Sequence, residues 1–138
     1  MVYITRKESF SAAHRLSRPD WSEEKNREVF GKCSNPNWHG HNYVLWVTVK
    51  GNVSSETGFV ANLSDVSNVI KQYIIDKVDH KNLDLDVDFM KGKKSSTEVF
   101  AVEIWNQIEE PLRKLGCNLH CVKIQETEKN IVEYFGKN

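Results

Sequence analysis

Apolar and polar residues alternate in two long stretches of the first third of the chain, a pattern that predicts two β-strands. In residues 2–13, a period of two places Phe10, Ala12 and His14 on one face. In residues 41–50, every second residue is apolar: Tyr43, Leu45, Val47 and Val49. Each strand is therefore expected to bury one face.

Two later stretches carry apolar residues at three- and four-residue steps, which is typical of amphipathic helices. The first begins after Asn62, a good N-cap, and is expected to end near Asp79. The second begins at Ser96 and ends near Gly116. Pro111 lies inside it and is expected to bend the helix or loosen its last turn.

Residues 119–125 and 131–135 are predicted to be the two strands of a hairpin. The order strand, strand, helix, helix, strand, strand predicts an α+β fold, with a four-stranded antiparallel sheet covered on one face by both helices. The 138 residues suit a single domain, 1–138. Residues 15–32 are charged and are expected to form a loop with a short helical turn at 22–26.

Nineteen basic and nineteen acidic residues cancel, so the composition disfavours a general nucleic-acid or membrane-surface binder and favours a small-molecule partner. No apolar run approaches the roughly 20 residues of a membrane span, and no signal-peptide core is present. The three cysteines include no CxxC pair and leave an odd thiol, which favours a reducing compartment. A cytoplasmic protein is expected.

Three histidines are candidates for a metal site. His39 and His41 are two residues apart, so in an extended chain they project from one face, about 7 Å apart. Antiparallel pairing of the first two strands would bring His14 to the same end. Three histidines with an open fourth position are typical of catalytic zinc, whereas paired surface or core histidines remain the alternative.

Cys33 differs in its surroundings from the other two cysteines. Cys117 and Cys121 flank or occupy a strand and suit the usual role of a free cysteine as a small buried hydrophobe. Cys33 follows Lys32 in a polar loop, where positive charge or a bound cation would lower the thiol pKa. Cys33 is therefore a candidate reactive thiol.

Three acidic residues and one further histidine have both a structural and a functional interpretation. His80 either complements a helix dipole or forms an acid–base pair with Asp79. Glu126 continues the apolar face of its strand, either as a surface carboxylate or as a group that binds the N–H-rich edge of a heterocycle. Glu98 is explained as a helix-capping residue and is a secondary candidate.

Six motifs occur in a fixed order: 10–16 (FSAAHRL), 31–37 (GKCSNPN), 39–43 (HGHNY), 79–84 (DHKNLD), 96–98 (STE) and 126–127 (ET). With them, the chain resembles the 6-pyruvoyl-tetrahydropterin synthase family over essentially its whole length. The resemblance implies the tunnelling fold (T-fold), in which sheets join into a barrel in a trimer. Two trimers then stack into a homohexamer with active sites at subunit interfaces.

The resemblance also implies roles for individual residues. His14, His39 and His41 match the ligands of one Zn²⁺ per subunit, and Cys33 matches the general base. The remaining matches are the partners of that base (Asp79 and His80), the pterin-anchoring glutamate of the charge relay (Glu126) and the pocket-lining segment (Thr97 and Glu98). Family members are also described as needing Mg²⁺, for which the chain carries no dedicated motif.

The implied reaction is the conversion of 7,8-dihydroneopterin triphosphate to 6-pyruvoyl-5,6,7,8-tetrahydropterin with loss of triphosphate, a lyase step in tetrahydrobiopterin biosynthesis. The alternatives are 6-carboxy-tetrahydropterin synthase of the queuosine pathway and a non-catalytic zinc- or pterin-binding module. The spacing from Cys33 to His39 and the Asn42 after His41 favour the pyruvoyl enzyme. Trp38 departs from the glycine usual in the family, and its ring is expected to crowd the loop or to cover the pocket mouth.

Overall fold

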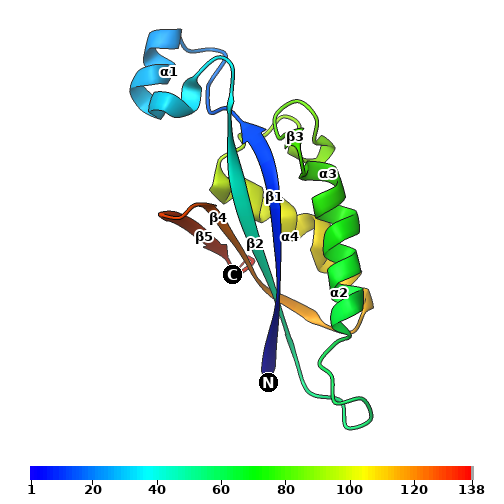
Figure 1. Cartoon of the computed structure of the whole chain (residues 1–138). Coiled ribbons are helices and arrows are strands. Elements are labelled where there is room, and N and C mark those ends of the chain that lie inside the picture. Colours follow the sequence, from blue (N-terminus) through cyan, green and yellow to red (C-terminus); the bar gives the residue numbers. More distant parts are fainter. Residues whose placement is uncertain (138) are drawn as a thin grey trace.

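The computed structural model describes residues 1–137, whose strands form one sheet in the order β3-β1-β2-β4-β5 (Figure 1). The strands are β1 (Val2–His14), β2 (His39–Gly51), β3 (Lys81–Asn82), β4 (Asn118–Thr127) and β5 (Asn130–Tyr134). The four longer strands pair antiparallel, as predicted, but β3 is a fifth strand parallel to β1. The prediction of four strands is wrong because two residues are too few to show a period.

Helices cover one face of the sheet (Figure 1). They are α2 (Leu63–Ile70), a π-helical segment (Lys71–Ile75), α3 (Asp76–Val78) and α4 (Thr97–Lys114). The first three follow one another without a break, where a single helix was predicted. The side chain of Asn62 caps α2 by accepting from the Ser64 N–H at 2.9 Å, and Ser96 caps α4 by accepting from the Val99 N–H at 3.3 Å.

The longest helix, α4, continues through Pro111 and ends at Lys114. Gly116 follows with a positive φ of 83°, a conformation that suits glycine just beyond a helix end. Within residues 1–137, no helix combines the length and apolar character needed to cross a membrane.

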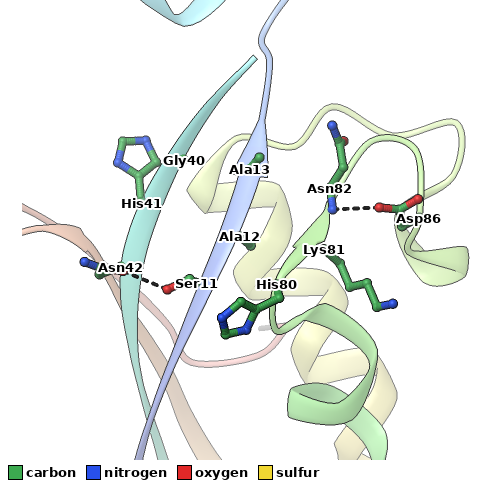
Figure 2. Close-up of a pocket in the computed structure, with 10 residues that line it drawn as sticks. All are labelled: Ser11, Ala12, Ala13, Gly40, His41, Asn42, His80, Lys81, Asn82 and Asp86. Carbon is green, nitrogen blue, oxygen red and sulfur yellow. Dashed lines mark hydrogen bonds between the residues drawn. The ribbon is translucent and has the colours of Figure 1, made fainter. Parts of the chain in front are cut away.

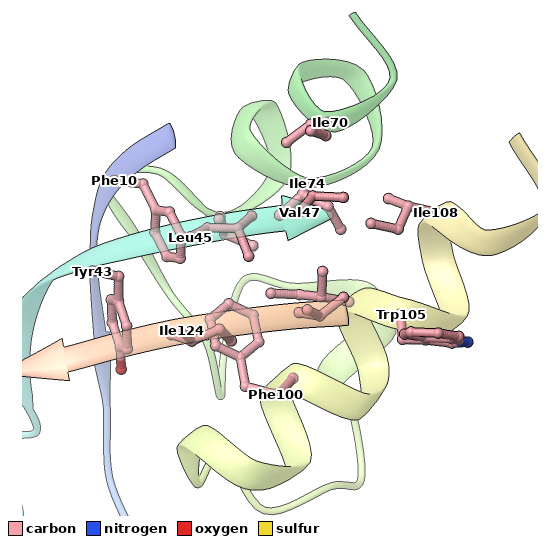
Figure 3. Packing of buried hydrophobic residues seen from close by; sticks show 14 of the residues in the cluster. Phe10, Tyr43, Leu45, Val47, Ile70, Ile74, Phe100, Trp105, Ile108 and Ile124 are labelled. Carbon is pink, nitrogen blue, oxygen red and sulfur yellow. The ribbon is translucent and has the colours of Figure 1, made fainter. Parts of the chain in front are cut away.

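The core lies between the sheet and the helices (Figure 3). Leu45 and Ile124 of the strands and Ile74 and Phe100 of the helices are completely buried. Each such side chain stabilises the fold by about 1.5–3 kcal/mol relative to an exposed one. His14 is also completely buried at the end of this apolar face, so the core presents an imidazole at one end of the sheet.

The connection between β1 and β2 is more ordered than predicted. It contains α1 (Glu23–Phe30) and a 3₁₀ helix (Gly31–Ser34), and it projects beyond the end of the sheet (Figure 1). Asn26 is buried, and its side chain both accepts from the Arg18 N–H at 2.7 Å and donates to the Arg18 carbonyl at 3.0 Å. These bonds stabilise a helix that has no apolar periodicity, which is why the sequence pattern indicated only a short turn.

Candidate active site

The three candidate histidines lie together at one end of the β1–β2 pair. His14 is the last residue of β1 and pairs directly with His39, the first residue of β2. The ring centroids of His14 and His39 are 4.5 Å apart, those of His39 and His41 4.8 Å, and those of His14 and His41 5.1 Å. One potential ligand atom from each ring lies within 4.8 Å of the others, so this histidine cluster could hold a metal ion.

The state of the ring nitrogens fits a metal ion. Each ring has a buried nitrogen without a hydrogen-bond partner in the described part of the chain: His14 Nε2, His39 Nδ1 and His41 Nε2. Burial lowers the pKa of both His39 and His41, which favours the neutral imidazole that binds metals. His14 Nδ1 lies 2.7 Å from the carbonyl oxygen of Ser95, a contact that orients the ring.

Glu126 lies beside the cluster on β4. Its Oε1 is 3.7 Å from His41 Nε2, and its Oε2 is 4.0 Å from His14 Nε2. The hydroxyl of Thr97, at the start of α4, donates to Glu126 Oε2. Glu98, the next residue of α4, is exposed, because successive helical residues point about 100° apart. The structure therefore brings Thr97 to the cluster and leaves Glu98 at the surface.

Cys33 lies in the 3₁₀ helix before β2 and is half-buried. Its carbonyl accepts from the Leu16 N–H at 2.7 Å, which ties it to the chain just after β1. Burial raises the pKa of the thiol, and the negative charge of Glu126 raises it further. The predicted lowering of the thiol pKa is wrong for the chain without a cation, because Lys32 is exposed and the burial effect dominates.

Asp79 and His80 lie at the edge of β1, where Asp79 Oδ1 is 2.9 Å from His80 Nδ1 and accepts from the Ser11 N–H at 3.0 Å. The side chain of His80 is 80% exposed. Within residues 1–137, no hydrogen bond or ion pair joins either residue to Cys33. One chain therefore does not assemble the expected trio of Cys33, Asp79 and His80.

An open hollow of about 510 Å³ lies over β1 and β2 beside His80. Figure 2 shows His80 near Ser11 and Asn42, with His41 further along β2. Both His41 and His80 line the hollow. One residue of the acid–base pair and one residue of the histidine cluster thus line the same depression.

The family model described as 6-pyruvoyl tetrahydropterin synthase matches residues 3–137. The chain belongs to this family. It is 46% identical to the 6-pyruvoyl tetrahydrobiopterin synthase of Drosophila melanogaster over 136 residues, which is 99% of this chain and 80% of the relative. A 6-carboxy-5,6,7,8-tetrahydropterin synthase of Bacillus subtilis is more distant, with 33% identity over 71% of this chain and 65% of the relative.

Among solved structures, the 6-pyruvoyl tetrahydropterin synthase of Caenorhabditis elegans matches with a TM-score of 0.86 and 40% identity, covering 99% of this chain and 96% of that one. The α+β class and the tunnelling fold are confirmed by this likeness. The family resemblance found in the six motifs is confirmed as well.

Trp38, which the resemblance sets against a glycine, has a φ of 62°, a backbone conformation that favours glycine. Its indole Nε1 donates to Asp84 Oδ2 at 2.9 Å, and the same oxygen accepts from the Arg15 N–H at 2.8 Å. The Arg15 guanidinium lies 5.9 Å from the ring centroid. Asp84 thus connects the residue after His14 to the residue before His39.

Two residues that position side chains of the site, Ser95 and Asp84, were not predicted. Ser95 acts through its carbonyl oxygen, which every residue type carries, so no sequence pattern marks it. Asp84 belongs to the motif at 79–84, and that motif was its only signal. Its bonds depend on which loops the fold brings together.

Trp38→Gly is expected to destabilise the protein by about 1 kcal/mol, although glycine suits the backbone better. The left-handed conformation costs Trp38 about 1–2 kcal/mol. A hydrogen bond to a carboxylate contributes about 1.5–3 kcal/mol, and the Arg15 contact about 0.5–1 kcal/mol. Urea unfolding at fixed protein concentration measures the net change in the free energy of unfolding. Trp38→Phe loses the N–H but keeps the unfavourable φ, so it should unfold at a lower urea concentration than Trp38→Gly. A midpoint for Trp38→Gly above that of the wild type would contradict this account.

Proposed function

We propose that this chain converts 7,8-dihydroneopterin triphosphate to 6-pyruvoyl-5,6,7,8-tetrahydropterin with elimination of triphosphate. It would thus be a carbon–oxygen lyase of tetrahydrobiopterin biosynthesis. The observation that carries the proposal is the histidine cluster with Glu126 beside it, in a chain 46% identical to relatives named for this activity. Three free cysteines support a cytoplasmic location.

His14, His39 and His41 would hold one Zn²⁺ per subunit and leave its fourth position open. When bound, the ion supplies positive charge that acidifies the substrate's side-chain hydroxyls and a nearby thiol. The Ser95 carbonyl, 2.7 Å from His14 Nδ1, would hold that ring in its ligand orientation. The ring nitrogens that lack a hydrogen-bond partner within residues 1–137 support this assignment.

Glu126 would anchor the pterin. A carboxylate presents two oxygens and can accept two N–H groups from one edge of a heterocycle. The Thr97 hydroxyl already donates to Oε2 and would keep the carboxylate plane in place. Glu126 lies within 4.0 Å of two cluster nitrogens, so an anchored pterin would extend its side chain over the histidines. Glu98 lies at the surface of α4, so it would contribute only to a pocket that is shared with a neighbouring subunit.

Cys33 would take a proton from the substrate side chain, and His80, oriented by Asp79, would return or relay protons. The internal redox change then proceeds by tautomerisation and needs no external hydride carrier. The separation of Cys33 from His80 within one chain supports a site shared between subunits of a homohexamer, a dimer of trimers. The 80% exposure of the His80 side chain leaves it accessible to a neighbouring copy. Mg²⁺ would accompany the triphosphate.

Turnover of 7,8-dihydroneopterin triphosphate by the zinc-loaded protein tests the proposal. We expect triphosphate release and a product with the mass of 6-pyruvoyl-tetrahydropterin. A chelator should stop the reaction and added Zn²⁺ should restore it. A 6-carboxy product with release of acetaldehyde would favour the queuosine-pathway enzyme instead. Zinc binding without any turnover would favour a non-catalytic module, and full activity after metal removal would contradict the metal's role.

A further inference from the structure

A second hollow, of about 320 Å³, lies beside Trp38. Three cationic side chains line it, Arg15, Lys93 and Lys94, together with one carboxylate, Asp84. The chain as a whole carries no net charge, so this is a local concentration of positive charge. The roles proposed for the histidine cluster, Glu126 and Cys33 make no use of it.

The hollow borders the histidine cluster through chain neighbours. Arg15 follows His14, and Trp38 precedes His39. Lys94 precedes Ser95, whose carbonyl oxygen lies 2.7 Å from His14 Nδ1. Three of the lining residues are thus one position away from a cluster histidine or from the group that orients one.

The hollow and Glu126 lie on different sides of the cluster. Gln125 of β4 pairs with Val44 of β2, which places Glu126 near the Tyr43 end of the cluster. From Tyr43 toward the start of β2, the next cluster residues are His41 and then His39. Trp38 comes just before the strand begins. A substrate anchored at Glu126 and lying across the histidines would therefore extend toward the hollow.

The lining charges suit a polyanion. Arg15 Nε donates to the Ser34 carbonyl at 2.9 Å, and within residues 1–137 its two Nη groups make no hydrogen bond. Among the described residues, Lys94 Nζ donates to the Ser17 carbonyl alone, at 3.3 Å. Arginine guanidinium groups and lysine ammonium groups are the usual partners of phosphate oxygens.

Three acidic groups reduce this positive charge without removing it. Asp20 pairs with Arg18 at 2.6 Å, and Arg18 and, to a smaller extent, Lys94 lower the pKa of the Asp20 carboxyl. Asp84 Oδ2 already accepts from the Arg15 N–H and from Trp38 Nε1, so that oxygen is engaged within the protein. Glu103 lies 3.3 Å from Lys93 Nζ and compensates that lysine. Arg15 and Lys94 are thus the cations available to a ligand.

We infer that this hollow binds the triphosphate chain of the substrate, with Arg15 and Lys94 as its principal contacts. The inference rests on the proposed function, since it takes the substrate to be a pterin triphosphate. Arg15 also holds the Ser34 carbonyl, and Arg15 variants would disturb the loop that carries Cys33. Lys94, exposed and bound to one carbonyl, is the better residue to change.

Calorimetric titration of the zinc-loaded protein with inorganic tripolyphosphate tests the hollow directly. Lys94→Met is expected to weaken tripolyphosphate binding about tenfold and to raise KM for the triphosphate substrate by a similar factor, with kcat nearly unchanged. Inhibition by 7,8-dihydroneopterin, which lacks the triphosphate, should be unaffected. Lys91→Met is the matched control, because Lys91 is exposed, pairs with Asp88 at 3.1 Å and does not line the hollow.

Wild-type tripolyphosphate affinity in the Lys93→Met, Lys94→Met double variant would overturn the inference. Equal weakening by Lys91→Met would also overturn it, because the effect would then be general electrostatic attraction. A wild-type protein that turns over no substrate would refute the proposed function, while the tripolyphosphate titration would still decide whether the hollow binds polyphosphate.

Discussion

Cys33→Ala is expected to lower kcat by about 10²–10⁴-fold, the usual contribution of a general acid or base, while zinc content stays at one ion per subunit. The thiol is not part of the histidine cluster, so its removal leaves the metal ligands intact. In the chain alone, burial and Glu126 raise the thiol pKa. Function as a base therefore requires positive charge near Sγ. Steady-state kinetics and metal analysis of the same preparation measure both quantities.

Cys117→Ala is the matched control for Cys33→Ala. Cys117 is buried, and its thiol donates to the Leu112 carbonyl at 3.3 Å at the end of α4. We expect a small loss of stability and unchanged kcat. A Cys33→Ala enzyme with wild-type activity would refute the proton-transfer role, whereas loss of zinc from that variant would mean that Cys33 supports the metal instead.

The double variant His39→Ala, His41→Ala is expected to lose zinc and all measurable turnover. Two of three imidazoles disappear, and His14 alone cannot form a zinc site. In the wild-type protein, zinc affinity should fall as pH falls, because protons compete for the same ring nitrogens. Atomic absorption after dialysis, compared with circular dichroism to confirm folding, gives the result.

His120→Ala controls for the general effect of removing histidine. His120 lies on β4 with its ring centroid 4.6 Å from that of Tyr3, and Tyr3 pairs at the opposite end of the β1–β2 ladder from His14. The zinc content of His120→Ala should match that of the wild-type protein. Undiminished zinc in the His39, His41 double variant would show that the ligand set is wrong.

The sequence pattern predicted the parts of this fold that depend on local rules. Period-two alternation identified the buried face of β2, and the caps at Asn62 and Ser96 identified the starts of α2 and α4. The sequence pattern also indicated that β1 ends at His14, the residue that pairs with His39. Each of these features follows from residues close together in the chain.

The features that were missed depend on contacts between distant segments. The pKa of Cys33 is dominated by burial and by Glu126, on another strand, rather than by its neighbour Lys32. β3 forms because the backbone after α3 reaches β1, where the Leu83 N–H donates to the Ala13 carbonyl at 2.8 Å. The placement of His80 away from Cys33 likewise depends on the path of the chain around Ser11.

The β1–β2 ladder has a consequence for how the protein folds. Its register runs without a shift from Val2 paired with Gly51 to His14 paired with His39. A slip by one residue would turn every side chain of β1 to the other face of the sheet, and His14 would then point away from His39 and His41. Metal capture would thus select the correctly aligned chain during refolding, and zinc uptake would report when the two strands have found their alignment.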